Sequence, residues 1–409
     1  MWDGYRSAEG GLYEQPENGP SGEEASTTQH HGGCILKVSI ALVSTYPPTI
    51  CGLASFTSSL RTALVADPGS TRRVRVVRVG ARQPEDPLEV VGWFQPGNPN
   101  STRRVAELLN GYDVVVVQHE YGIYGPESGV ALLGLVDLLR RPLVVTAHTV
   151  LASPSPPQLS IMAELADKAA AVVAMSQTAA DRMVSLYGVS DSKVRFIPHG
   201  TTGFSSPAPF LPSERPTLLT WGLVGPGKGL EYGIEALTHL RDLRPRYVIA
   251  GRTHPMVQAV EGEAYRVRLA ALAHRLGVEP LVRFIPRYLD GDTLARIVRR
   301  ADAVLLPYES TEQVTSGVLV EAVASNVPVI ATDFPHAREL AAVGAVLTVP
   351  HRDPAAIAHA VRQVWNSPER RRGLLAAQRR VGRLHTWERV ARQYLDLAEE
   401  VAVESTLAP

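Results

Sequence analysis

The chain has 409 residues, which suggests two to three domains at roughly 150 residues each. Its 41 Lys and Arg residues balance 41 Asp and Glu residues, and 45% of the residues are hydrophobic. This composition excludes a mostly disordered chain, which would be poorer in apolar residues and usually charged. A neutral chain has no overall field that attracts phosphate backbones, so we expect no nucleic-acid partner.

The cysteines and the hydropathy bear on the compartment. Cys34 and Cys51 cannot form a framework of disulfides, and no C-x-x-C or Cys/His zinc spacing is present. We see neither a secretory signal nor a window of about 20 apolar residues that could span a bilayer. We therefore expect a cytoplasmic protein without a Cys/His zinc site.

Residues 1–33 are rich in Gly, Glu and Ser and have no apolar period. Such a composition predicts a disordered, mildly acidic tail. The paired His30 and His31 could bind a metal ion, but a solvated tail is the more frequent outcome for such a segment.

Short apolar runs recur after the tail and predict buried strands. Most are continuous and rich in Val and Ile, as in a parallel sheet covered by helices on both faces. The first series is Val38–Val43, Val74–Val79, Val114–Val117, Leu143–Thr146, Ala171–Ala174 and Val194–Ile197. The second series is Leu218–Trp221, Tyr247–Ala250, Val282–Ile285, Ala303–Leu306, Val327–Ala331 and Ala345–Val349.

Segments of helical length lie between these runs and carry apolar residues three and four positions apart. Two such stripes are formed by Phe56, Leu60 and Leu64, and by Ile234, Leu237 and Leu240. A last helix is predicted near Trp387–Val401, and we expect Glu404–Pro409 to fray.

Ser and Pro dominate Thr201–Pro216, between the two series, which predicts an interdomain linker. The expected fold class is α/β, with two doubly wound parallel sheets that each have a crevice at the carboxyl ends of the strands. The predicted organisation is a tail at 1–33, a domain at 34–203, a linker at 204–216, a second domain at 217–382, and a C-terminal helix and tail at 383–409. A ligand would bind in the cleft between the domains.

Residues 221–229 read W-G-L-V-G-P-G-K-G, directly after a predicted strand and before a predicted helix. Glycines let backbone N–H groups approach an anion, a helix N-terminus adds a favourable dipole, and Lys228 adds a positive charge. Together they suit a diphosphate, although the order of a Walker A loop is absent. The alternative is a tight turn with an exposed lysine.

A second candidate segment reads E-Q-V-T-S-G-V-L-V-E-A and begins at Glu312. Ser316 is a suitable N-cap and Gly317 would open the helix, so free N–H groups there could hold a phosphate oxygen. Glu321 lies just over one helical turn further on, where its carboxylate could accept two ribose hydroxyls. The alternative for Glu321 is a solvated or ion-paired helix residue.

Taken together, these segments resemble the retaining glycosyltransferases of family 4, which have the GT-B fold. The resemblance covers about residues 36–400 and includes the glycine–lysine loop and the helix with Glu321 followed by N-V-P-V-I-A-T. Further matching segments are Ser44–Phe56, Gln118–Gly125, Ala174–Ser176 and Ile197–Gly200.

The resemblance implies a role for each matching residue. Lys228 would neutralise the diphosphate of a nucleotide sugar, and Glu321 matches the second glutamate of the family's Glu-x7-Glu motif, which grips the ribose. His148 occupies the position of the family's histidine near the transferred sugar. The remaining donor-binding candidates are Gly52, Gly222, Gly227 and the backbone of Ser316, Gly317 and Val318. Lys228, His148 and Gln313 are the catalytic candidates.

Two positions depart from the family pattern. Leu223 stands where the family commonly has arginine, and Gln313 replaces the first glutamate of the motif. Gln313 can hydrogen-bond to sugar hydroxyls but carries no negative charge to stabilise an oxocarbenium ion. A shifted register could let Glu312 or Glu309 substitute, and either of two arginines could replace the missing guanidinium, namely Arg252 and Arg287.

His119 and Glu120 follow a predicted strand and could line the acceptor side of the cleft, or hydrogen-bond within their own loop. Basic clusters occur at Arg299–Arg300, Arg370–Arg372 and Arg379–Arg383. They could help the protein dock on an anionic membrane at its cytoplasmic face, although a solvated helix face is the more frequent outcome.

The predicted function is transfer of a hexose from a nucleoside diphosphate sugar to a hydroxyl on a glycan, a lipid-linked acceptor or a small molecule. The resemblance implies retention at the anomeric carbon and no required metal, and we expect no cofactor. One alternative is another GT-B enzyme, such as a sugar-nucleotide epimerase or a phosphorylase. The other is a non-catalytic nucleotide-sugar or glycan-binding protein, which Leu223 and Gln313 motivate.

Overall fold

The computed structural model describes residues 38–66, 72–202 and 215–407. The predicted tail with His30 and His31, Cys34, and most of the predicted linker at 204–216 lie outside these residues.

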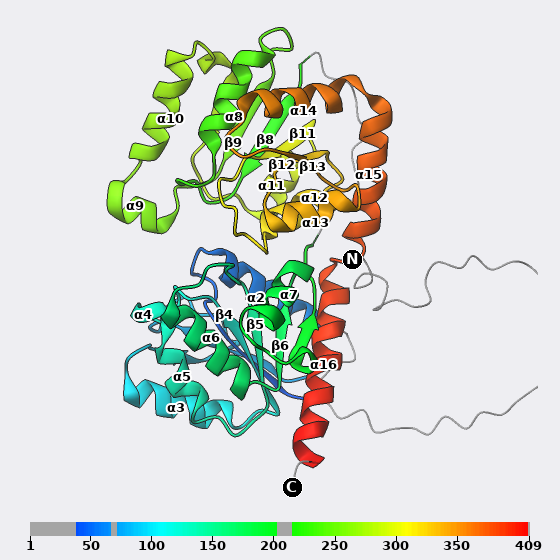
Figure 1. Cartoon of the computed structure of the whole chain (residues 1–409). Coiled ribbons are helices and arrows are strands. Elements are labelled where there is room, and N and C mark those ends of the chain that lie inside the picture. The colour runs from blue at the N-terminus through cyan, green and yellow to red at the C-terminus, as the bar shows by residue number, and fades with distance from the viewer. Residues whose placement is uncertain (1–37, 67–71, 203–214, 408–409) are drawn as a thin grey trace, which may run out of the picture. The chain divides into compact units, whose positions relative to one another are not determined.

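The first half of the chain builds a sheet of seven parallel strands in the order β3-β2-β1-β4-β5-β6-β7. We call this sheet and its covering helices the first domain (Figure 1). Its strands are β1 (Ile40–Ser44), β2 (Val74–Val79), β3 (Val90–Phe94), β4 (Val114–His119), β5 (Leu143–Ala147), β6 (Ala171–Ala174) and β7 (Val194–Phe196).

Strand β3 was not predicted from the sequence. It lies at the edge of the sheet and alternates buried with half-buried residues, so it lacks the continuous apolar run of a central strand. Gly92 also interrupts the apolar run. A larger residue would not fit there, because its Cβ would lie 2.7 Å from Cδ2 of Leu108 on the helix that packs against this strand.

The second half builds six parallel strands in the order β10-β9-β8-β11-β12-β13, which is the second domain. All six predicted runs form strands: β8 (Thr217–Trp221), β9 (Arg246–Ala250), β10 (Val282–Ile285), β11 (Ala303–Leu306), β12 (Val329–Thr332) and β13 (Leu347–Val349). The predicted class, α/β with two doubly wound parallel sheets, is confirmed.

Helices cover both faces of each sheet, because successive strand residues point to opposite faces and both faces are apolar. In the first domain one face packs on α3 (Pro99–Leu109), α5 (Ala131–Val136), α6 (Pro156–Lys168) and α7 (Gln177–Ser185). The short α4 (Pro126–Gly129) lies beside α6. The other face packs on α2 (Gly52–Leu64) and α16 (Trp387–Leu407).

In the second domain one face packs on α8 (Leu230–Ala236), α10 (Ala264–Arg275) and α14 (Pro354–Asn366). The other face packs on α11 (Gly291–Val298), α12 (Gly317–Ala324), α13 (Pro335–Ala342) and α15 (Pro368–Gly382). The predicted apolar stripe in this half is buried, but it divides between α8 and a 3-10 turn at Leu237–Leu240.

The last helix, α16, returns to the first domain (Figure 1). The hydroxyl of Tyr394 lies 3.0 Å from Oγ1 of Thr146 on β5, and Val390 is fully buried. Gly200 lets the helix start here, because a Cβ on it would lie 2.3 Å from the Trp387 ring. The helix runs to Leu407, so the prediction that the chain frays from Glu404 is wrong for the described residues.

Among the helices described, none is long and apolar enough to cross a membrane. The described residues also contain no group of three or more His, Cys, Asp or Glu side chains that could hold a metal ion.

Candidate functional site

One pocket is lined by loops that follow the strands of both sheets. From the first domain come Gly52, Glu120, His148 and His199, and from the second domain come Gly222, Leu223, Lys228, Arg252, Gln313 and Glu321. The carboxyl ends of parallel strands are where doubly wound folds bind ligands. Most of the residues singled out in the sequence are thus brought together.

Lys228 stands at the end of the loop between β8 and α8. Gly229 follows it with φ at +60°, and a Cβ there would lie 1.8 Å from the carbonyl oxygen of Pro307, so the turn needs glycine. The Lys228 Nζ atom lies 4.1 Å from the centroid of the Tyr308 ring. Desolvation in the pocket wall lowers the pKa of this ammonium group below its ordinary value.

Glu321 projects from α12 into the same pocket. Its Oε2 atom accepts a hydrogen bond of 3.3 Å from Nε1 of Trp221, at the end of β8. Burial raises the pKa of this carboxyl, and the Trp221 hydrogen bond opposes that shift. Glu321 is half-buried, lines the pocket and forms no ion pair with the described residues, which argues against the alternative of a solvated or ion-paired helix residue.

Ser316 caps α12 as predicted, since its Oγ accepts a hydrogen bond of 3.2 Å from the Leu319 N–H. Its own N–H is already bound, because it donates to Nδ1 of His336 at 3.0 Å. The prediction that the Ser316 N–H faces a phosphate therefore needs correction. The next two residues of the first helical turn, Gly317 and Val318, line the pocket as Ser316 does.

Gly317 approaches the first domain closely. A Cβ at this residue would lie 2.9 Å from Nε2 of His199, so a larger residue would push the start of α12 away from the opposite wall. The absence of a side chain at Gly317 thus keeps the N-terminus of α12 accessible and lets the two walls of the pocket lie close together.

Gln313 lines the pocket, and its Nε2 donates to the carbonyl oxygen of Thr315 at 3.1 Å. The two glutamates that could have replaced it by a register shift face elsewhere. Glu309 accepts from Nε of Arg352 at 2.9 Å, and Glu312 binds the first domain through the Ala152 N–H at 2.7 Å. Neither Glu309 nor Glu312 lines the pocket.

His148 lies at the end of β5 and is held by two neighbours. Its Nε2 donates to Oε1 of Gln118 at 2.8 Å, which leaves Nδ1 as an acceptor. Its ring packs edge-on against Phe56, with centroids 4.8 Å apart. Burial lowers its pKa to about 3, so the ring is neutral near pH 7.

His199 lines the pocket and was given no role from the sequence. Its Nδ1 lies 2.7 Å from the carbonyl oxygen of Gly200, and its ring packs on Phe56 at 4.9 Å. Burial lowers its pKa to about 4. The signal was present in the segment I-P-H-G, but only the fold places that segment opposite α12.

Only one of the two acceptor-side candidates lines the pocket. Glu120 lines the pocket, accepts a hydrogen bond from Oγ1 of Thr149, and has a pKa raised by burial. His119 does not line the pocket, because its buried ring lies 4.8 Å from that of Tyr121 and 6.4 Å from that of Tyr124. The prediction for His119 is therefore corrected to a packing role.

Of three other candidates, one from the glycine loop and two arginines, only Arg252 lines the pocket. Gly227 does not line the pocket, and its carbonyl oxygen accepts from the Glu309 N–H at 2.9 Å. Arg252 lines the pocket beside Leu223, whereas Arg287 does not. The chain pairs these two segments, because the Val224 N–H donates to the Arg252 carbonyl oxygen at 2.9 Å.

Family models match both halves of the chain. The model described as Glycosyltransferase Family 4 matches residues 60–202, and the one described as Glycosyl transferases group 1 matches residues 204–381. A D-inositol 3-phosphate glycosyltransferase of Xylanimonas cellulosilytica is 30% identical over 244 residues, which is 56% of each chain. The match thus spans about half the length of that relative.

Two solved structures are similar over most of this chain. A glycosyltransferase from Rickettsia africae has a TM-score of 0.72 at 16% identity and covers 89% of this chain and 98% of its own. The Anabaena protein HepE in complex with UDP-glucose has a TM-score of 0.69 at 19% identity and covers 88% and 99%. At such identities the likeness shows the fold.

Proposed function

Because the chain belongs to glycosyltransferase family 4, a family of retaining enzymes with the GT-B fold that use nucleotide-sugar donors, we propose that it transfers a hexose from a nucleoside diphosphate sugar to a hydroxyl acceptor. The anomeric configuration would be retained. The observation that carries this proposal is one pocket that holds an ammonium group, a helix N-terminus and a half-buried carboxylate.

Each of these groups fits one part of a nucleotide sugar. The Lys228 ammonium and the N–H groups of Gly317 and Val318 would bind the diphosphate, since an ammonium and a helix N-terminus both favour anions. Glu321 would accept hydrogen bonds from two ribose hydroxyls. Gly52 and Gly222 line the same pocket without side chains that would fill it.

The departing diphosphate would be stabilised by electrostatics rather than by a strong acid. Negative charge grows on the diphosphate as the glycosidic bond breaks, and donors fixed in a pocket that excludes water stabilise that charge most. The acceptor hydroxyl would pass its proton to a diphosphate oxygen on the same face of the sugar. No metal ion or cofactor takes part in this proposal.

His148 and Gln313 would contact the transferred sugar. A neutral His148 with Nδ1 free to accept could bind a sugar hydroxyl, and the Gln313 amide could bind another. Glu120 would face the acceptor from the first domain. Acceptors to test are D-inositol 3-phosphate, which the curated relative's name suggests, and glycan or lipid-linked hydroxyls.

The experiment is a thermal-shift screen of UDP-, GDP- and ADP-sugars, followed by an assay of nucleotide release with and without acceptors. A ligand that binds only the native state raises its melting temperature. UDP-glucose comes first because HepE binds it. The proposal fails if no nucleotide sugar binds, or if Lys228→Ala binds the best donor as tightly as the parent.

A non-catalytic nucleotide-sugar or glycan-binding protein is the second candidate, and two pocket residues favour it. Leu223 brings no charge to the pocket, and Gln313 brings no carboxylate. Donor binding without nucleotide release across the acceptor panel would establish this candidate. Donor turnover without acceptor, or sugar 1-phosphate formed with inorganic phosphate, would instead indicate an epimerase or a phosphorylase.

We also propose a cytoplasmic location with contact to an anionic membrane. Exposed arginines support this contact at the end of α11 and along α15, among them Arg299, Arg300, Arg372, Arg380 and Arg383. Sedimentation with vesicles that contain anionic lipid, compared with neutral vesicles, tests it. Equal sedimentation with both would rule it out.

A further inference from the structure

The segment that carries Gln313 contacts the first domain on both sides of that residue. Glu312 binds the first domain through its carboxylate, and Val314 is buried within the core of that domain. Between them, Gln313 and Thr315 line the pocket. Alternate residues therefore face opposite ways, as in an extended backbone. Glu312 and Val314 are the two anchors that fix the direction of Gln313.

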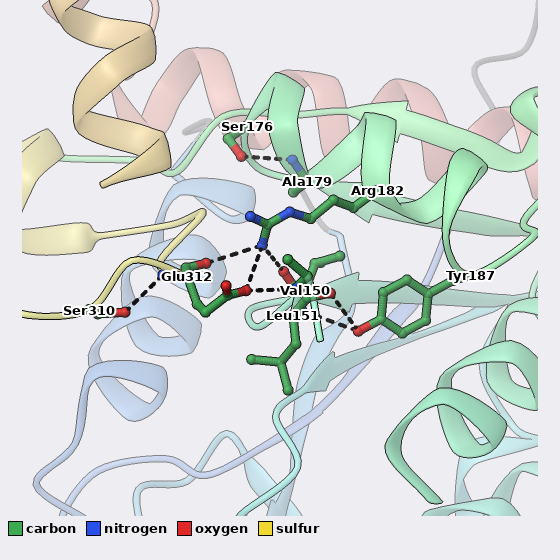
Figure 2. Close-up of polar contacts among 9 residues, drawn as sticks. Val150, Leu151, Ser176, Ala179, Arg182, Tyr187, Ser310 and Glu312 are labelled. Carbon is green, nitrogen blue, oxygen red and sulfur yellow. Dashed lines mark hydrogen bonds and ion pairs between the residues drawn. The ribbon is translucent and has the colours of Figure 1, made fainter. Parts of the chain in front are cut away.

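The first anchor is built around Arg182 of α7 (Figure 2). Its Nη1 atom donates to the carbonyl oxygen of Val150 at 2.8 Å, and to the carbonyl oxygen and Oε2 of Glu312 at 3.2 and 3.4 Å. Oε2 of Glu312 also accepts the Ala152 N–H at 2.7 Å. The Arg182 side chain is 16% exposed and that of Glu312 is 40% exposed, so the guanidinium end of this network is shielded from water while the carboxylate end reaches solvent.

The surface that receives Glu312 is itself held in place. The Tyr187 hydroxyl, just after α7, accepts the Leu151 N–H at 3.1 Å and donates to the Leu151 carbonyl oxygen at 3.2 Å (Figure 2). The hydrogen bonds to Arg182 and Tyr187 thus hold the Val150–Ala152 loop in place where it binds Glu312. Two donors aligned in advance hold a carboxylate in one direction better than mobile side chains do.

Helix α13 ties the far side of the same segment to α7. The His336 N–H donates to the Gln313 carbonyl oxygen at 3.3 Å, and His336 Nδ1 accepts from Ser316. Three residues on, Glu339 accepts the N–H groups of Gln177 and Thr178 at 3.1 and 2.7 Å, at the N-terminus of α7. A carboxylate at that end is favoured by the helix dipole.

We propose that Arg182 is a positioning residue, which holds Gln313 toward the reacting sugar through Glu312. This inference rests on the proposed function. The donor-binding groups Lys228, Glu321 and Gly317 belong to the second domain, and Arg182 contacts none of them. Loss of Arg182 should therefore lower the rate of transfer rather than the affinity for the donor.

The test compares Arg182→Met, Arg182→Lys and Glu312→Gln with the parent by steady-state kinetics. The matched control is Arg362→Met, which removes an Arg–Asp242 pair within the second domain, 2.6 Å long and away from the pocket. Because a small misplacement can cost up to about 100-fold in rate, we expect kcat of Arg182→Met to fall about 10- to 100-fold. We expect its donor KM to stay within about twofold of the parent.

Arg182→Lys should recover part of the lost kcat, because it keeps a charged donor, and Arg362→Met should match the parent. The inference is overturned if kcat of Arg182→Met stays within about twofold of the parent, or if its donor KM rises as much as kcat falls.

Hydrogen exchange separates this inference from the proposed function. If the parent neither binds nor turns over a nucleotide sugar, the proposed function fails, but the contact can still be measured. Faster exchange at Ala152 and in the 311–316 peptide of Arg182→Met than of Arg362→Met supports the role of Arg182 in holding this segment. Equal exchange in the two variants overturns it.

Discussion

The Lys228 ammonium nitrogen lies 4.1 Å above the ring of Tyr308, and no carboxylate of the described residues lies within salt-bridge distance of it. A cation held by an aromatic face rather than by a carboxylate keeps its net positive charge. Desolvation lowers its pKa because a buried ammonium lacks a compensating anion. An incoming diphosphate would supply that anion.

Lys228→Ala should weaken donor binding by about 10- to 100-fold, since hydrogen bonds to charged groups contribute about 1.5–3 kcal/mol. Calorimetry with the best nucleotide sugar measures this. The control is Lys193→Ala, which removes a lysine bound to the carbonyl oxygens of Ala166 and Asp167 in the first domain and should leave affinity unchanged. In the parent, kcat/KM should fall at high pH earlier than an ordinary lysine would dictate, because the charged form binds the donor.

Glu321→Gln should weaken binding of both the nucleotide sugar and the free nucleotide by about tenfold, because an amide accepts ribose hydroxyls less strongly than a carboxylate does. The ligand-free melting temperature should not fall. The folded-state pKa of Glu321 is raised, so the ionised group costs stability as the pH rises past its ordinary value, and glutamine removes that cost. Unchanged affinity would refute the ribose role.

Arg252 should supply the positive charge that Leu223 does not. Both line the pocket from neighbouring segments that are bridged at Val224 and Thr253. Arg252→Ala should weaken donor binding by about tenfold, and Leu223→Arg in that background should restore it. The critical result is the donor affinity of the double variant. If it binds the donor no more tightly than Arg252→Ala, an arginine at position 223 does not replace Arg252.

Four histidines with a lowered pKa, two of them buried and two half-buried in the pocket wall, should make the protein sensitive to acid. Burial lowers the pKa to about 4 in His119 and His199 and to about 3 in His148 and His336. The unfolded state binds more protons than the folded state between about pH 4 and 6.5, so the free energy of unfolding falls as the pH is lowered through that window.

Each such histidine contributes up to about 1.4 kcal/mol per pH unit. Urea unfolding at pH 5, 6 and 7 measures the slope, and the titration of His148 can be followed by NMR. A slope near zero between pH 5 and 6, or a His148 that gains its proton near pH 6.5, would contradict this prediction.

Gly200→Ala should destabilise the protein by about 1–3 kcal/mol, because the new Cβ would overlap the Trp387 ring and push the start of α16 away from the first domain. Gly373→Ala is the control: no atom lies within 4 Å of a Cβ there, in the exposed part of α15. That variant should gain up to about 1 kcal/mol, since alanine favours helix. Equal melting temperatures of the two variants would contradict this prediction and would show that the Trp387 ring can move at little cost in stability.

The sequence was sufficient to predict the class of fold and to single out two residues, Lys228 and Glu321, that the structure places in one pocket. Twelve of the thirteen strands in the described residues could be predicted because a strand buried on both faces needs a continuous apolar run, which is a local property. Lys228 and Glu321 could be singled out because a glycine loop and a helix start are local patterns too. The edge strand β3 was not predicted because two of its five residues face partly open surroundings.

Contacts between segments far apart in the chain were decided by the tertiary structure. His336 takes up the Ser316 N–H from 20 residues away, Arg182 meets Glu312 across 130 residues, and α16 returns to the first sheet. No periodicity or spacing encodes such pairs, because each depends on how two sheets and their loops pack in three dimensions. The sequence therefore determined which chemical groups the pocket contains, and packing determined which of them remain free to bind a ligand.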